Sequence, residues 1–392
     1  MKEQFRTIHR LVEDNRDEMI RFWEKLVNID SGSRNLAGLE KMCQAVRERM
    51  EEIGFITQVI LCGNAGPILV GDLNREIGTT PILFIGHMDT VFSEGEAEKN
   101  PFRIDSEGHA HGPGVLDMKA GLVIALYAAK ILKAMGYNDH PIRCIFAGDE
   151  ENLHMFSDAK ARMSDAAEGG CAAFNFETGY PDDGLVVGRN GGGIFELTVD
   201  GVSVHSGIAP WEGRSAIAEM CNKVLELEKC NDYSRGKMVN CGVIQGGTTS
   251  NTVPGHCKLD ISIRFPSSDI KNEIVEDLKR IAGMTFIEGT ATTLSEKALM
   301  ESMDTTDGVR ELYAHIEKTA ADCGYGKVHS FRVGGVSDSG IMVMRGIPTV
   351  CALGVKGEFN HTPREYAIVD SLFERTALAA SIVHEFDNQE VK

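Results

Sequence analysis

The fold is indicated most clearly by the stretch Gly86-His87-Met88-Asp89-Thr90-Val91. It follows an apolar run, residues 81–85, of the kind that forms a strand buried on both faces in a parallel α/β sheet. Ligands of such sheets collect outside the carboxyl ends of the strands. His87 and Asp89 therefore lie where chemistry is expected. A lone His-x-Asp is more often a surface turn, so the pair indicates a site only if other segments send matching groups there.

Composition limits the class of protein. A chain of 392 residues exceeds what one hydrophobic core usually serves, so we expect two domains. Forty lysines and arginines against 58 acidic residues give a formal net charge of −18, which disfavours binding to nucleic acid and to anionic membranes. The ten cysteines form no Cys-x-x-Cys pair, and the longest apolar run, residues 121–129, is much shorter than the ~20 residues of a spanning helix. With no signal-peptide pattern at the charged N-terminus, we expect a cytoplasmic protein.

Hydrophobic periodicity changes along the chain. In residues 1–188 and again in residues 303–392, amphipathic helical segments alternate with apolar strands, which predicts one α/β domain with a mixed, largely parallel sheet. Residues 189–302 follow the order β-α-β-β-α-β with one-sided alternation, the ferredoxin-like arrangement. We therefore expect a discontinuous catalytic domain with an inserted α+β domain.

In four further segments, acidic or histidine side chains lie next to the end of a predicted element, as His87 does. One is a glycine-rich turn before a helix, and the others follow predicted strands, at 141–147, 171–176 and 347–353. These side chains are Asp117, Glu150, Glu151, Glu177 and His361. Because strand ends of a parallel sheet meet at one edge, we expect the side chains to converge there.

A set of histidines and carboxylates without cysteine is typical of a catalytic rather than a structural zinc site, and Co²⁺ or Mn²⁺ would also fit. Five candidate ligands are too many for one catalytic zinc but suit two metals that share a bridging carboxylate, a known device for hydrolysis. Glu150 and Glu151 are adjacent and point different ways. One can bind a metal while the other takes the proton from the attacking water and passes it to the leaving amine.

The ordered motifs resemble those of the co-catalytic zinc metallopeptidase family that contains carboxypeptidase G, peptidase T, acetylornithine deacetylase and aminoacylase-1. Within this family, the sequence is most similar to the carboxypeptidase G (glutamate carboxypeptidase) type. The resemblance covers nearly the whole chain. The motifs are Gly-His-Met-Asp-Thr-Val (86–91), Gly-Pro-Gly-Val-Leu-Asp-Met-Lys-Ala-Gly (112–121), Gly-Asp-Glu-Glu (148–151), Phe-Glu-Thr-Gly (176–179) and Asn-His-Thr-Pro (360–363).

The resemblance implies a zinc-peptidase-like catalytic domain, an inserted lid and dimerisation domain, and two Zn²⁺ per subunit. Asp117 would bridge the metals, with a cis peptide bond to Met118. The remaining ligands would be His87 and Glu177 for one metal, and Glu151 and His361 for the other. Asp89 would orient the His87 imidazole, and Glu150 would be the general base.

The resemblance also assigns roles in the inserted domain. His205 would reach the site of a neighbouring subunit and support the oxyanion. Asn251 and Arg264 would bind substrate, the guanidinium holding a free α-carboxylate. Gly335 lies in a stretch that matches the family's glycine-rich substrate loop. From the residues alone, His205 would be an ordinary loop histidine and Arg264 a surface charge.

Three segments depart from the family pattern. After Glu151 the family continues with small residues, whereas this chain has Asn152-Leu153-His154-Met155, a difference in the pocket wall and hence in substrate choice. Phe359-Asn360 is bulkier than the residues usual before the final histidine. His109 and His111 form a tempting His-x-His pair, but the family has no ligand there, and we expect them at the surface.

We therefore expect a homodimeric dinuclear zinc hydrolase that cleaves the amide bond to a C-terminal amino acid of a small peptide. An N-acyl-amino-acid deacylase with the same mechanism stays open, because the loops that build the acyl pocket cannot be placed from sequence. A non-catalytic metal-binding relative is disfavoured, since no expected ligand or base is lost. A nucleotide-binding oxidoreductase is weaker still, because no Gly-x-Gly-x-x-Gly follows the first strands.

Overall fold

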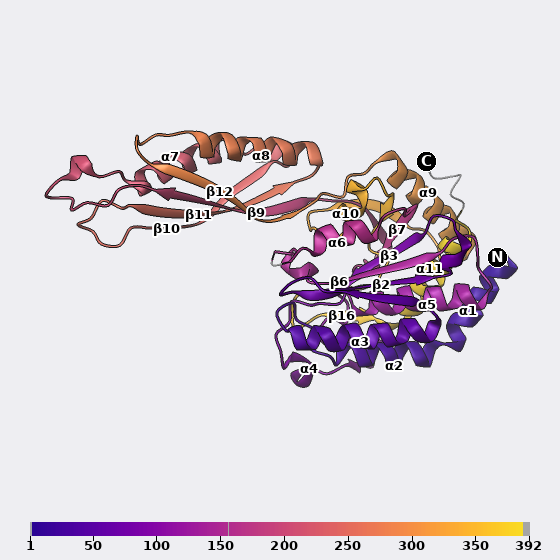
Figure 1. The fold of residues 1–392 in the computed structure, drawn as a ribbon. Helices are drawn as coiled ribbons and strands as arrows, with labels where there is room; N and C mark the ends of the chain where they lie inside the picture. Colours follow the sequence, from indigo (N-terminus) through magenta and orange to yellow (C-terminus); the bar gives the residue numbers. More distant parts are fainter. Residues whose placement is uncertain (1, 156, 387–392) are drawn as a thin grey trace. The chain divides into compact units, whose positions relative to one another are not determined.

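The computed structural model describes residues 2–155 and 157–386, which form two compact units (Figure 1). The first unit comprises Met1–Gly188, Thr305–Val333 and Ser337–Lys392, and the second comprises Arg189–Asp304 and Gly334–Val336. The buried apolar residues of the second unit form a cluster of their own. Each unit therefore has its own core.

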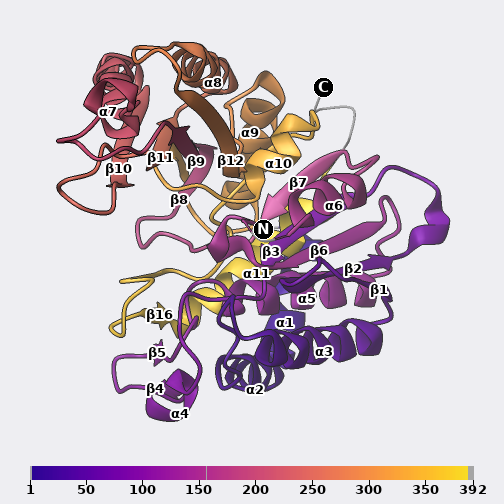
Figure 2. The same ribbon diagram turned by 60° about the vertical axis from the view of Figure 1, so that its left-hand side comes forward.

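A six-stranded mixed sheet forms the centre of the first unit, with the order β1-β2-β6-β3-β7-β14 (Figure 2). The strands are β1 (Ile56–Ile60), β2 (Gly66–Leu73), β3 (Ile82–His87), β6 (Ile142–Gly148), β7 (Ala172–Asn175) and β14 (Thr349–Val350). β6, β3, β7 and β14 are parallel, whereas β1 and β2 pair antiparallel at one edge. The predicted mixed, largely parallel sheet is confirmed.

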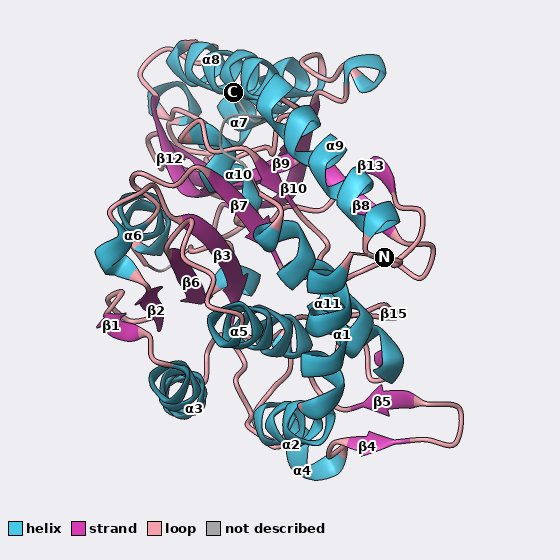
Figure 3. Ribbon diagram, turned by 90° about the vertical axis from the view of Figure 1, so that its right-hand side faces the viewer, coloured by secondary structure: helices cyan, strands magenta, loops and turns pink. Residues whose placement is uncertain are grey.

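Helices cover both faces of this sheet, as the continuous apolar run before His87 predicted. In β3, Ile82 and Phe84 belong to one buried cluster, and Leu83 and Ile85 belong to another, because successive side chains of a strand point to opposite faces. The first cluster contains residues of α1 (Glu3–Asp14), α2 (Arg16–Val27), α3 (Leu36–Ile53), α5 (Lys119–Ala134), α9 (Asp307–Asp322) and α11 (Val369–His384). The second contains residues of α6 (Ala159–Ala166) and α10 (Ser339–Met344), and Figure 3 shows α5 and α6 on opposite sides of β3 and β6.

Local signals fix the ends of α3 where the sequence predicts them. The Asn35 side chain accepts a hydrogen bond from the Gly38 amide, 3.0 Å away, and so caps the helix N-terminus. Gly54, with φ of 108°, ends the helix in the left-handed region that glycine adopts without strain. Both ends of α3 therefore follow from local sequence signals.

The second unit is a four-stranded antiparallel sheet with two helices on one face (Figure 1). Its elements are β9 (Gly191–Asp200), α7 (Ala216–Glu228), β10 (Met238–Gly246), β11 (His256–Phe265), α8 (Ser268–Gly283) and β12 (Ala291–Met300). The order β10-β11-β9-β12 confirms the ferredoxin-like arrangement. The last strand begins at Ala291, because a turn at Ile287–Thr290, with Gly289 at φ of 86°, precedes it.

Shorter elements complete the fold. They are α4 (Glu96–Lys99), β4 (Arg103–Ile104), β5 (His109–His111), β8 (Gly184–Arg189), β13 (His329–Val333), β15 (Gly357–Glu358), β16 (Tyr366–Ile368) and 3₁₀ turns at Arg75–Ile77, Glu150–Asn152, Pro210–Glu212 and Tyr233–Arg235. β15, β16, β5 and β4 form a small sheet. Among the helices of the described ranges, none is both long and apolar enough to cross a membrane.

Candidate metal centre

Three adjacent parallel strands end at the candidate centre. His87 is the last residue of β3, Glu150 lies two residues after the end of β6, and Glu177 lies two residues after the end of β7. In the sheet register His87 pairs with Ala147, so the ends of β3 and β6 are level. The topology alone therefore brings the histidine and the two carboxylates to one edge of the sheet.

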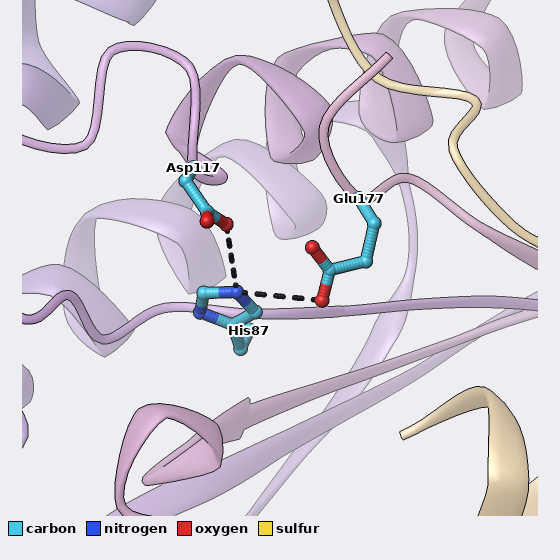
Figure 4. A group of neighbouring side chains, drawn as sticks. All are labelled: His87, Asp117 and Glu177. Carbon is cyan, nitrogen blue, oxygen red and sulfur yellow. Dashed lines mark ion pairs between the residues drawn. The ribbon is translucent and has the colours of Figure 1, made fainter. Parts of the chain in front are cut away.

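Two sets of possible metal donors share one carboxylate. His87, Asp117 and Glu177 each offer a donor atom within 4.8 Å of the others, and so do Asp117, Glu151 and His361. In the first set, His87 Nε2 lies 3.3 Å from Asp117 Oδ1 and 3.6 Å from Glu177 Oε1 (Figure 4). In the second, His361 Nε2 lies 3.1 Å from Asp117 Oδ2 and 3.3 Å from Glu151 Oε2. The two oxygens of Asp117 thus face different histidines.

Backbone and side-chain contacts fix Asp117 in the turn before α5. The peptide bond from Asp117 to Met118 is cis. A carboxylate oxygen of Glu365 accepts hydrogen bonds from the Leu116 and Asp117 amides, at 2.7 and 3.1 Å, and the Asn360 side-chain amide donates to Asp117 Oδ2 at 3.1 Å. Burial, with the charge of Asp117, raises the pKa of Glu365 to about 8.

His361 reaches the centre on a loop between β15 and β16. The strand expected at residues 347–353 is only Thr349–Val350, so His361 does not directly follow it as predicted. Phe359 and His361 both adopt left-handed backbone, with φ of 64° and 63°. Phe359 is one of the residues that depart from the small residues of the family pattern, and it adopts this conformation although it carries a bulky side chain.

Asp89 ties the ends of β3 and β6 together. Its side chain is fully buried, and its two oxygens accept hydrogen bonds from the amides of Glu150 and Glu151, each at 3.1 Å. The Ser33 hydroxyl donates to the same carboxylate at 2.7 Å. His87 Nδ1 lies 3.3 Å from Asp89 Oδ1 and 3.0 Å from the Asp89 carbonyl oxygen, so the ring is oriented with Nε2 toward the donor sets.

The charges of the centre are those of a cation site. Burial raises the pKa of Glu150 well above its ordinary value, and the nearby charges of Glu177 and Asp338 act in the same direction. Glu151 Oε1 is buried and accepts no hydrogen bond from the described residues. Closely packed, buried carboxylates repel each other unless cations lie between them. The nitrogen and oxygen donors, without sulfur, fit Zn²⁺, Mn²⁺ or Co²⁺.

The other predicted site residues belong to the second unit. His205 and Asn251 lie on adjoining loops, because the Ser206 amide donates to the Asn251 carbonyl at 2.9 Å. The Gly207 amide donates to His205 Nδ1 at 3.1 Å, which leaves Nε2 as the nitrogen that carries the proton of the neutral ring. Arg264 lies on β11 beside Gly192, where a side chain would clash with the guanidinium. The Gly335 carbonyl lies 3.5 Å from Arg189.

Sequence reasoning missed several residues that hold the centre together. Ser33, Asn360 and Glu365 each bind a predicted site residue or its backbone. Asn360 stands in the motif of His361, whereas Ser33 and Glu365 stand in no motif, and each of the three contacts a residue far away in the sequence. His109 and His111 lie beside Asp105 and Tyr366 rather than with the donor sets.

Two donor sets that share a carboxylate at the strand ends of an α/β unit are typical of hydrolases that use two metal ions. The sequence profile of peptidase family M20/M25/M40 matches residues 83–385, and this chain belongs to that family. It is therefore a metallopeptidase, a hydrolase of peptide bonds, and the resemblance drawn from the motifs is confirmed.

Individual proteins are similar to this chain over most of its length. Carboxypeptidase G2 of Pseudomonas sp. (strain RS-16) is 25% identical over 375 residues, which cover 94% of this chain and 89% of the relative. The aminopeptidase PepT of Bacillus cereus has the same fold, with a TM-score of 0.72, 21% identity, and coverage of 95% and 98% of the two chains. The YXEP protein of Bacillus subtilis, described as a dinuclear metal binding peptidase, has a TM-score of 0.65, 17% identity, and coverage of 95% and 99%.

We expect the substitution Asp89→Asn to lower zinc affinity about 10–100-fold, because an amide cannot accept from both backbone amides and Ser33 while orienting His87. Competition against a chromophoric chelator measures this. The matched control is Asp105→Asn, which removes a surface carboxylate that also pairs with a histidine, and it should leave the affinity unchanged. Equal zinc affinity of the Asp89 variant and the wild type would contradict the role given to Asp89.

Proposed function

We propose that this chain is a dinuclear zinc hydrolase that cleaves the amide bond to a C-terminal amino acid, as a carboxypeptidase or dipeptidase does. The observation that carries the proposal is the placement of Asp117, whose two oxygens face His87 and His361 at 3.3 and 3.1 Å. One metal would be held by Asp117 with His87 and Glu177. The other would be held by Asp117 with Glu151 and His361.

The metals, when bound, supply the Lewis acidity that activates water and polarises the scissile carbonyl. Glu150 is the general base in this proposal. Its carboxylate is buried, lies 4.0 Å from His87 Nε2, and is not a member of either donor set. A carboxylate whose burial favours the protonated form can accept the proton of the attacking water and deliver it to the leaving nitrogen. Asp89 keeps the backbone of Glu150 and Glu151 in position for this.

The second unit is proposed to be the lid that completes the substrate site. The Nε2–H of His205 would donate to the oxyanion, in the site of a neighbouring subunit. Arg264 would hold the α-carboxylate of the released amino acid in two-pronged fashion, and Asn251 would bind the substrate beside His205. Gly335 lies on the loop expected to line the substrate. The Arg264 guanidinium donates to the Ile263 carbonyl at 2.8 Å and to the Ser262 hydroxyl at 3.4 Å.

A groove of about 410 Å³ on the first unit offers room for the rest of the substrate. It is lined by the segments 32–35 and 90–94 and by Glu151 and Asn152, so it adjoins one proposed metal ligand. The names of two similar proteins, carboxypeptidase G2 and the aminopeptidase PepT, support a small peptide as the substrate. The description of a third as a dinuclear metal binding peptidase supports two metals.

Zinc is the proposed metal, because histidine and carboxylate donors suit it in catalytic sites. The cytoplasm is the proposed location. All ten cysteines are free thiols, and six of them are buried, which suits a reducing compartment.

The second unit is also the proposed dimer surface. β10 is an edge strand of nine residues, and it contains no charged residue and no proline. Val243 and Ile244 are 49% and 51% exposed on it. Edge strands of monomers are usually protected by charges, prolines or bulges, because an open strand edge pairs with other chains. β10 has one bulge, between Cys241 and Val243, but otherwise offers an open edge to the same strand of a second copy.

Incubation with a mixed panel of dipeptides and N-acyl amino acids tests the activity. We expect release of the C-terminal amino acid, read by mass spectrometry, that requires zinc and is abolished by EDTA. Glu150→Gln should lower the rate at least about 100-fold, because it removes the base but keeps the shape. Glu107→Gln, an exposed control, should not change it.

Release that survives both EDTA and Glu150→Gln would overturn the mechanism. Release from N-acyl amino acids alone would retain the mechanism and assign the deacylase activity in place of the peptidase.

Charging the β10 edge tests the dimer. We expect Val243→Lys to sediment as a monomer in analytical ultracentrifugation, because two lysines would oppose each other across the paired strands. Thr293→Lys, on the other edge strand β12, is the matched control and should remain dimeric. A Val243 variant that stays dimeric would place the interface elsewhere.

A further inference from the structure

A buried histidine lies between two carboxylates beside the proposed base. His154 Nδ1 is 2.6 Å from Asp149 Oδ1, and Nε2 is 2.7 Å from Asp338 Oδ1. All three side chains are about 2% exposed and belong to the first unit. Ser157 donates to the other oxygen of Asp149. His154 lies in the segment 152–155, where the chain departs from the small residues usual in the family.

The two short distances define the protonation of the ring. A carboxylate only accepts hydrogen bonds when ionised, so a ring nitrogen that faces it at this distance must donate. Because His154 faces a carboxylate from both nitrogens, both carry a proton and the ring is an imidazolium. Burial alone would lower the pKa of His154, but Asp338 and Asp149 raise it well above its ordinary value. The cluster then carries a net charge of −1.

The imidazolium joins two segments that are distant in sequence. Asp149 directly precedes the proposed base Glu150 and is two residues before Glu151. Asp338 directly precedes α10, and Asp338 Oδ2 has no hydrogen-bond partner among the described residues. Without His154, two buried carboxylates would face each other across the gap.

The backbone around His154 adopts an uncommon conformation. Leu153 and His154 both adopt left-handed backbone, with φ of 56° and 52°. The Leu153 amide donates to the Glu150 carbonyl at 2.7 Å, and the His154 amide donates to the Asp149 carbonyl at 3.2 Å. Non-glycine residues persist in this region when surrounding contacts hold them there. The imidazolium supplies such contacts, and it does so one turn away from the proposed catalytic residues.

We propose that His154 is a positioning residue for the reaction: its imidazolium fixes the turn that carries Glu150 and Glu151 by binding Asp149 on one side and Asp338 on the other. The inference rests on the proposed function for its catalytic meaning. Asp89 holds the amides of this turn from the β3 side, and His154 holds the turn from the α10 side. Placement errors of about 1 Å at a reacting group can cost on the order of 100-fold in rate.

An ordinary buried histidine of the same unit provides the comparison. His140 is 7% exposed, and its Nδ1 lies 2.8 Å from the Thr80 carbonyl oxygen. It precedes β6, and Thr80 precedes β3, so this pair lies at the amino ends of the strands whose carboxyl ends carry the site. His140→Gln therefore removes a buried histidine without disturbing the proposed catalytic turn.

The test compares His154→Gln with His140→Gln at saturating zinc. Glutamine cannot donate to carboxylates on both sides, so we expect kcat of the His154 variant to fall about 100-fold with KM changed less than about threefold. The His140 variant should keep both constants. Adding Asp338→Asn to His154→Gln returns the cluster to its net charge of −1 and should recover about tenfold in kcat. A merely structural role would instead make the second substitution neutral or harmful.

A spectroscopic readout separates this inference from the proposed function. In zinc-loaded, ¹⁵N-histidine-labelled wild-type protein, a histidine with both ring nitrogens protonated should be seen at neutral and mildly alkaline pH, and that signal should vanish in His154→Gln. A wild type that hydrolyses nothing in the panel but shows this signal would reject the function and retain the imidazolium bridge. An unchanged kcat in a folded His154 variant, no recovery in the double variant, or no such signal would overturn the inference.

Discussion

The carboxylate of Asp89 is the interaction on which the site depends most. It accepts hydrogen bonds from the amides of Glu150 and Glu151 and orients His87. One buried side chain therefore joins the carboxyl ends of β3 and β6. A fully buried charge is stable only when its oxygens are saturated with donors, and here the Ser33 hydroxyl completes the set. The relative placement of a metal ligand and the proposed base therefore follows from one side chain.

The sequence was sufficient to predict those helices and strands whose apolar residues recur with a fixed period. The apolar run before His87 predicted a strand covered on both faces, and the one-sided alternation in residues 189–302 predicted a sheet covered on a single face. The strand before His361 was placed in the right segment but is shorter than predicted. Residues 347–353 are β-branched and apolar because they are buried, and only Thr349 and Val350 pair with β7.

Contacts that close over a long sequence separation could not be predicted. Glu365 binds the backbone amide of Asp117, and His154 binds Asp338. The local sequence around Glu365 or His154 does not indicate either partner. The bulky segment after Glu151 was recognised as a departure from the family and interpreted as part of the pocket wall. In the structure it provides a buried cation between two carboxylates. Asp89 holds one side of the turn through backbone amides, and His154 holds the other side through Asp149.

The central claim is that Asp117 is shared by two metal ions. Anomalous X-ray diffraction from crystals grown with zinc, measured on both sides of the zinc absorption edge, tests it most directly. The account predicts two anomalous peaks about 3.5–4 Å apart. One should be bound by His87 and Glu177 and the other by Glu151 and His361, with an oxygen of Asp117 on each. A single peak, or two peaks that do not share Asp117, would contradict the account.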